Sequence, residues 1–184
     1  MSQQHNETVV DLLLRQHTEI RELFSMVGER SGKDREETFE RLRHLLAVHE
    51  TAEEEIVHPF ARRTIGNGER IIDARLKEEK EAKELLQELE KTGTDTPEFG
   101  PLFDRLQKAV EAHAEHEERL EFPEIAEKAT EQQLKGMVAA VKAAEAVAPT
   151  HPHPGSESVT KHVALGPISA VVDRTRDAIR KAMS

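Results

Sequence analysis

Apolar residues recur at alternating steps of three and four residues in four segments, and this spacing constrains the fold most strongly. The first segment runs Val10, Leu14, His17, Ile20, Phe24 and Val27. It predicts an amphipathic helix from about residue 7 to 30. Three later segments predict further helices that begin near residues 34, 68 and 101 and end near 60, 92 and 123. With 34% charged and only 3% aromatic residues, the composition also favours solvated helices, so we expect an all-α fold.

The second and fourth segments are copies of one pattern. When the sequence is shifted by 64 residues, Phe39 aligns with Phe103 and the residues that follow also match. The first and third segments align at an offset of 62, which pairs Leu14 with Leu76. The repeat unit is therefore a helical hairpin used twice, which predicts an up-down-up-down four-helix bundle over residues 1–130.

The rest of the chain predicts additions to this bundle. Pro59 and Pro123 are expected to end or kink the second and fourth helices. Residues 131–148 indicate an accessory helix, residues 149–160 a linker rich in Pro, His, Gly and Ser, and residues 161–184 a C-terminal amphipathic helix. We expect the last helix to dock on the bundle, because its apolar stripe would otherwise be exposed, and pairing with another chain is the alternative.

Polar residues occupy positions inside the four apolar stripes. They are His17, His49, Glu53, Glu79, His113 and Glu117. A His and a Glu four residues apart share a helix face, so the second and fourth helices can each present a nitrogen and an oxygen to one point. Burying three carboxylates with three imidazoles costs several kcal/mol per ion without compensation. Two divalent cations would remove that cost, whereas a salt-bridged structural core is the alternative.

Four short segments carry a family resemblance over residues 10–125. They are QH at 16–17, HETAEEEIVHP at 49–59, EEKEAKELL at 78–86 and HAEHEERLEFP at 113–123. This pattern resembles the hemerythrin-like, HHE cation-binding family. The resemblance implies a non-haem centre of two iron ions bridged by oxide or hydroxide, although manganese or zinc would also suit the ligands. Glu79 stands where the family usually has His, and the added carboxylate should favour ferric iron and weakens the expectation of oxygen carriage.

Other histidines and glutamates rank lower as ligands. His116, three residues after His113, could replace or supplement a ligand. His58 could support the site from the end of the bundle, although facing water is the simpler interpretation. The side chains interpreted as solvated are His44, His151, His153, Glu54, Glu55, Glu118 and the Glu/Lys run at 77–91.

Charge and composition limit the partners. A net charge of −10 without a basic stripe argues against nucleic acid and anionic membranes. The chain has no cysteine, so any metal must be held by His, Asp or Glu. The N-terminal sequence lacks the pattern of a signal peptide and no membrane span is apparent, so a cytoplasmic location is expected. For the oligomeric state, we expect a monomer or a weak homodimer.

The resemblance and the ligand set suggest redox chemistry on a small oxidant. The first hypothesis is catalase-like or peroxidase-like turnover of hydrogen peroxide or dioxygen. The second is binding or sensing of dioxygen, nitric oxide or iron without turnover. A metal that only stabilises the bundle is the third.

Overall fold

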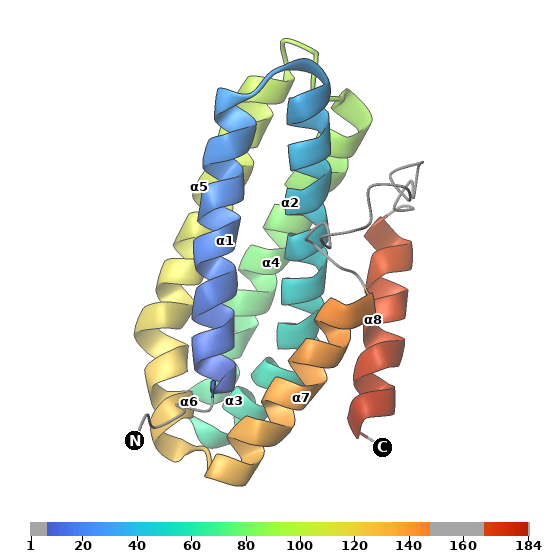
Figure 1. The fold of residues 1–184 in the computed structure, drawn as a ribbon. Helices are drawn as coiled ribbons and strands as arrows, with labels where there is room; N and C mark the ends of the chain where they lie inside the picture. Colours follow the sequence, from blue (N-terminus) through green and yellow to red (C-terminus); the bar gives the residue numbers. More distant parts are fainter. Residues whose placement is uncertain (1–6, 148–167, 184) are drawn as a thin grey trace, which may run out of the picture.

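The computed structural model describes residues 7–147 and 168–183, which form helices and connecting turns without a strand. The elements are α1 (Val9–Glu29), α2 (Gly32–Ala52), η1 (Glu53–Val57), α3 (His58–Thr64), α4 (Gly68–Thr92), α5 (Phe99–His116), η2 (Glu117–Glu121), α6 (Phe122–Lys128), α7 (Glu131–Val147) and α8 (Ile168–Met183). Here η1 and η2 are single π-helical turns. Figure 1 shows α1, α2, α4 and α5 as the long antiparallel rods of a bundle. The expected all-α, up-down-up-down bundle is confirmed.

Local signals explain where the helices begin. The Thr8 hydroxyl accepts a hydrogen bond from the Asp11 amide, and the Asp11 carboxylate accepts one from the Thr8 amide, so α1 starts with a capping box. The turn before α4 places Asn67 in the left-handed region at φ 56°, a conformation that Asn tolerates better than most residues. The second of these signals lies in the short connection after α3, where the chain turns back so that α4 packs against α3.

The second and fourth rods continue beyond Pro59 and Pro123 instead of ending there. The rod α2–η1–α3 runs to Thr64, and the rod α5–η2–α6 runs to Lys128. Each proline lies in the first turn of the α-helical piece that follows a π turn. In η1 the backbone N–H of His58 donates to the carbonyl of Glu53, five residues earlier. The prolines therefore coincide with a local widening of the helix, and the sequence repeat extends to this irregularity in both halves.

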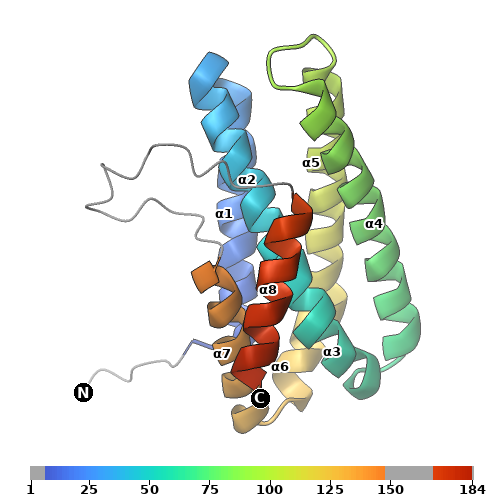
Figure 2. The ribbon, with the colours of Figure 1, turned by 90° about the vertical axis from the view of Figure 1, so that its right-hand side faces the viewer.

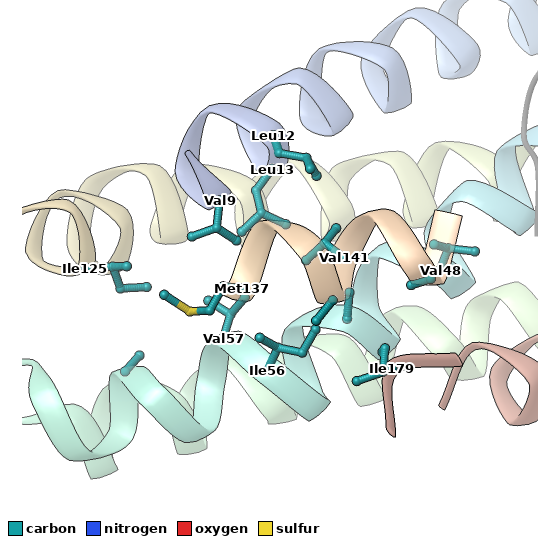
Figure 3. Close-up of a cluster of buried hydrophobic side chains, with 14 of the residues drawn as sticks. Val9, Leu12, Leu13, Val48, Ile56, Val57, Ile125, Met137, Val141 and Ile179 are labelled. Carbon is teal, nitrogen blue, oxygen red and sulfur yellow. The ribbon is translucent and has the colours of Figure 1, made fainter. Parts of the chain in front are cut away.

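Two apolar clusters fill the interior, one toward each end of the bundle. One contains Phe24, Leu42, Leu89 and Phe103. The other joins the first turns of α1 to α3, α6, α7 and α8, and Figure 3 shows part of it around Met137. In α1, α4 and the rod α5–η2–α6, the polar residues of the stripes lie in sequence between residues of these two clusters.

The apolar stripes were placed incorrectly at three positions. Leu14, Leu76 and Leu120 are 38%, 36% and 48% exposed, although the spacing predicted them to be buried. In α1 the buried residues are instead Leu12 and Leu13. Because α1 also packs against α7, its buried face turns toward that helix in the first turns.

The two C-terminal helices pack on one side of the bundle, next to α2 (Figure 2). Val171 and Ile179 of α8 are buried in the apolar cluster, and Arg176 Nε donates to Glu55 Oε1 at 2.8 Å. The expected docking of the C-terminal helix is therefore confirmed. The linker predicted at 149–160 lies outside the described residues. Within the described ranges, each helix is too short or too polar to cross a membrane.

Candidate metal centre

A buried polar layer crosses the middle of the bundle. It brings together all six residues singled out in the stripes, and it adds His58 at the start of α3 and Glu121 at the end of η2. Each of these eight side chains is at most 5% exposed. The layer thus collects four imidazoles and four carboxylates from all four rods.

The first group of donors comes from α1, α2 and the two π turns. Nitrogen and oxygen atoms of His17, His49, Glu53 and Glu117 all lie within 4.8 Å of one another. His17 Nε2 is 3.1 Å from His49 Nε2 and 3.3 Å from Glu117 Oε2. His49 Nε2 is 3.3 Å from Glu53 Oε2. Ligand atoms about 2.1 Å from one ion and at right angles to each other lie about 3 Å apart, so these spacings fit a single cation.

A second group adjoins the first. Donor atoms of Glu53, His58 and Glu79 also lie within 4.8 Å of one another, and His58 Nε2 is 2.6 Å from Glu79 Oε1. His113 Nε2 approaches Glu117 Oε1 at 3.4 Å and Glu53 Oε2 at 3.9 Å. Glu53 and Glu117 therefore face donors of both groups, as carboxylates that bridge two metal ions do.

The outer nitrogen of each imidazole lies against a hydrogen-bond partner. His17 Nδ1 is 2.8 Å from Glu118, His49 Nδ1 is 2.8 Å from the Gln16 side-chain oxygen, and His113 Nδ1 is 3.2 Å from Glu78. His58 Nδ1 is 3.0 Å from Glu121. Such partners keep the proton on Nδ1 and leave Nε2 free for a metal.

Several inner atoms of the layer lack hydrogen-bond partners. Both carboxylate oxygens of Glu53 and of Glu117 are buried without one, as are Glu79 Oε2 and His113 Nε2. Buried polar atoms are normally paired, because leaving one unpaired costs about 1–3 kcal/mol. Unpaired oxygens that converge on nitrogen donors are what a site for cations provides, so the residues present fit a metal centre.

The charges within the layer are strongly coupled. Burial, assisted by the charge of Glu117, raises the pKa of Glu53 to about 8. Burial acts in the same direction at Glu117, but the charge of His113 and the proximity of the His17 ring, at 3.3 Å, outweigh it and lower the pKa of Glu117 to about 2. Burial lowers the pKa of His49 well below its usual value, and the charge of His17 adds to this effect. A cation bound between these groups would balance the negative charge of the carboxylates, which protons balance when no cation is bound.

A small cavity borders the layer on the side of the first apolar cluster. Its volume is about 10 Å³, roughly the space for one water-sized molecule. The polar side chains around it include His17, His49, Glu79 and His113, and the apolar ones include Phe24, Leu46 and Val110. The donor atoms are thus within reach of a molecule of a few atoms and are shielded from bulk water.

The sequence-based expectations were wrong for several residues around the site. His58 was expected to face water but is 2% exposed, and the orienting residues Glu78 and Glu118 were read as solvated. His44 was also read as solvated but is only 1% exposed in α2. His116 does lie near the site, where its Nδ1 is 2.9 Å from Glu78, but its side chain is 43% exposed and it belongs to none of the donor groups.

The internal duplication is the sequence signal that could have revealed the position of His58. Its repeat partner is Phe122, and both residues directly follow the π turns. In a regular α-helix, His58 would point about 140° away from Glu53, because successive residues are about 100° apart. The π turn brings it back toward the interior, and this irregularity is not encoded in an apolar stripe.

Comparison with known proteins identifies the family of this polar layer. The model of the hemerythrin HHE cation binding domain matches residues 8–125. An uncharacterized hemerythrin-like protein of Schizosaccharomyces pombe is 25% identical over 138 residues, which cover 74% of this chain and 68% of the relative. The fold is similar to the crystal structure of a hemerythrin HHE cation binding domain-containing protein from Mycobacterium kansasii, with a TM-score of 0.67, 22% identity, and coverage of 91% of this chain and 98% of that chain. With its donors gathered between the four rods, this chain belongs to the hemerythrin HHE cation-binding domain family.

Proposed function

We propose that this protein holds two iron ions and uses them to turn over hydrogen peroxide or dioxygen in catalase-like or peroxidase-like chemistry. The observation that carries the proposal is the small cavity directly beside two adjoining groups of buried donors. A binding protein without turnover remains the alternative outcome of the experiments below.

Two cations suit the donor layer better than one. The two groups share Glu53, and Glu117 faces His17 on one side and His113 on the other. Two divalent ions would bring four positive charges against the three negative charges of Glu53, Glu79 and Glu117. That balance supports a two-metal centre in a place where unpaired charges are costly.

The donors are imidazoles and carboxylates, which suit iron, manganese and zinc, and the sequence offers no thiolate. Among these metals, iron is proposed because of its redox chemistry. When bound, a pair of iron ions would supply the change of oxidation state that reactions of peroxide and dioxygen require. The side chains of this chain would fix the position of the ions, orient the imidazoles and exclude water.

The cavity supports a small oxidant as the substrate. A space of about 10 Å³ accommodates a molecule near the size of water but no organic substrate. Phe24, Leu46 and Val110 form an apolar wall, which suits an uncharged molecule such as dioxygen or hydrogen peroxide. Sugars, nucleotides and peptides would have no access to the donor atoms through this space.

The direct test is metal analysis combined with peroxide turnover. Metal-free protein is reconstituted with ferrous iron, the iron bound per chain is measured, and oxygen release from hydrogen peroxide is recorded. We expect two iron ions per chain and turnover well above that of the same concentration of free iron. Glu117→Ala and His113→Ala should lose most of the iron and the turnover, because each removes donors from the shared region of the layer.

The matched control is His44→Gln, which changes a buried histidine outside the donor groups. It should retain both irons and the turnover. Two irons without turnover would replace the enzyme proposal by binding or sensing, and one iron or none in the wild type would refute the two-iron centre.

A further inference from the structure

We propose that His58 is itself a metal ligand, which completes the second donor group with Glu53, Glu79 and His113. This inference rests on the two-metal centre proposed above and names a ligand that the apolar stripes did not contain. The expectation that it faces water is excluded by its burial at the start of α3.

The first argument is the geometry that His58 shares with the other three histidines of the polar layer. Its Nε2 points at a carboxylate of the layer, Glu79 Oε1 at 2.6 Å, and its Nδ1 lies 3.0 Å from Glu121. His17, His49 and His113 have the same arrangement, with Nε2 toward the donor atoms and Nδ1 against an outer partner. An imidazole oriented by a carboxylate on its outer nitrogen is the usual arrangement of a metal-bound histidine.

The second argument is the local backbone. The amide of His58 donates to the carbonyl of Glu53 across the π turn, so these two residues return to nearly the same side of the rod. Phe122 follows the other π turn and also turns inward, where its ring stacks on His17 at 5.5 Å between centroids. Both π turns thus direct one side chain into the layer, and only the first delivers a nitrogen donor.

The third argument is the balance of donors between the two groups. His17 and His49 supply two imidazoles to the first group. Without His58, the second group would keep only the carboxylates Glu53 and Glu79, and its nearest additional imidazole would be His113, whose Nε2 lies 3.9 Å from Glu53 Oε2. With His58, each group has two imidazoles, and the three carboxylates Glu53, Glu79 and Glu117 complete the set. Seven donors then surround two ions, with room for a small molecule.

The competing role for His58 is an ion pair that only positions Glu79 and Glu121. In that role the ring would keep a proton on both nitrogens when metal is bound. In the ligand role, the metal ion replaces the proton on Nε2, the proton is released to solvent, and Nε2 bonds to the metal directly. The two roles therefore differ at a single atom, His58 Nε2, which can be observed without any turnover.

The experiment is NMR of the full chain with isotope-labelled histidine nitrogens, titrated with Zn²⁺. Zinc binds the same donors, is diamagnetic and has no redox chemistry, so the result does not depend on peroxide turnover. The His58 signals are assigned by their loss in His58→Gln. We expect the Nε2 signal of His58 to move on saturation together with those of His17, His49 and His113.

Metal affinity gives an independent measurement. His58→Gln and His58→Phe should bind the second Zn²⁺ at least about tenfold more weakly than the wild type, as measured by titration calorimetry. The phenylalanine variant reproduces the residue at the repeat position, Phe122, and circular dichroism checks that it folds. His116→Gln is the matched control, because His116 also contacts a carboxylate but lies outside the donor groups.

A His58 Nε2 signal that keeps its proton at zinc saturation would overturn the proposal, as would wild-type affinity for both ions in the two variants. Should the wild type bind a single zinc ion, the two-metal centre would fail, yet the His58 signal would still decide whether His58 is a ligand. Failure of peroxide turnover with a coordinated His58 would refute the proposed enzyme activity alone.

Discussion

Each histidine of the polar layer is oriented by a residue that the ligand pattern does not include. Gln16 is fully buried directly before His17 in sequence, but its side-chain oxygen accepts from His49 on the neighbouring helix. Its amide nitrogen donates to Glu145 of α7 at 2.8 Å. The orientation of His49 therefore depends on α1 and, through Gln16, on the accessory helix.

Replacing Gln16 tests this dependence. Gln16→Leu keeps the approximate volume of the side chain but removes the acceptor for His49 Nδ1 and the hydrogen bond to Glu145. We expect metal affinity to fall by about tenfold to a hundredfold, the usual effect of losing an outer partner of a ligand. Competition with a fluorescent chelator measures it. The exposed Gln133→Leu serves as the control, and equal affinity of Gln16→Leu and wild type would contradict the role of Gln16.

At the scale of the elements, the connection between α3 and α4 allows no side chain at Gly68. A Cβ atom built there would lie 2.6 Å from the Arg62 carbonyl oxygen and 2.7 Å from that of Ala61. These are backbone atoms that cannot move independently. The close approach of α4 to the end of α3 is therefore possible only with glycine, and it places Glu79 against His58.

Two glycine substitutions should have opposite effects on stability. Gly68→Ala is expected to lower the free energy of unfolding by about 1–3 kcal/mol, because the backbone must shift to relieve the overlap. Gly136→Ala, on the exposed side of α7 with open space around it, should raise it by about 0.5–1 kcal/mol. Urea denaturation of both variants measures the difference. An unchanged free energy of unfolding in Gly68→Ala would show that α3 and α4 approach less closely than the structure indicates.

The docking of α8 on α2 places His44 where its protonated, positively charged form is disfavoured. Burial lowers the pKa of His44, and although Glu40 acts in the opposite direction, Arg43 and Arg174 of α8 also disfavour its charged form. Both ring nitrogens are buried without a hydrogen-bond partner. The folded protein thus holds this histidine neutral at a pH where the unfolded chain already binds a proton.

The sign of the resulting pH dependence follows from the lowered pKa. As pH falls through the unfolded value of about 6.5, the unfolded state takes up a proton that folded His44 does not, so stability decreases. In His44→Gln this contribution is absent. Thermal denaturation at about pH 7.5 and about pH 5.5 should therefore show a smaller loss of melting temperature in the variant than in the wild type. An equal or larger loss in the variant would contradict the buried, neutral state of His44.

At the scale of the whole molecule, the polar layer divides the interior into two apolar clusters. A layer of buried carboxylates with unpaired oxygens weakens a bundle unless cations occupy it. This chain belongs to a family of cation-binding domains, and the layer gathers donors suited to cations, so we expect metal binding and folding to be coupled.

Metal removal tests that coupling. Protein treated with a chelator should unfold at a lower temperature than the metal-loaded protein, and returning the metal should restore the difference. At a free metal concentration a hundred times the dissociation constant, the expected stabilisation is about 2.7 kcal/mol. The double variant Glu53→Ala/Glu117→Ala should melt at the same temperature with and without metal. Identical melting of loaded and metal-free wild type would show that the layer is stable without cations.

Much of this molecule could be predicted from the local spacing of residues. The four rods, the accessory helix, the docking of the last helix and the burial of the six stripe residues follow from periodicity and duplication, because a helix must bury its apolar face. The His/Glu pairs four residues apart are visible for the same reason, since one turn of one helix brings them together.

The tertiary structure decided what depends on irregular backbone and on contacts between helices. The π turns rotate His58 into the layer, and neighbouring helices supply Glu78, Glu118 and Gln16 to the outer nitrogens of three other histidines. Packing of α7 moved the buried face of α1 away from Leu14, and α8 covers the side of α2 that the sequence left to solvent. The sequence alone thus determined which residues share a helix face. Packing of all the helices decided which of these faces meet and which nitrogen of each imidazole points into the layer.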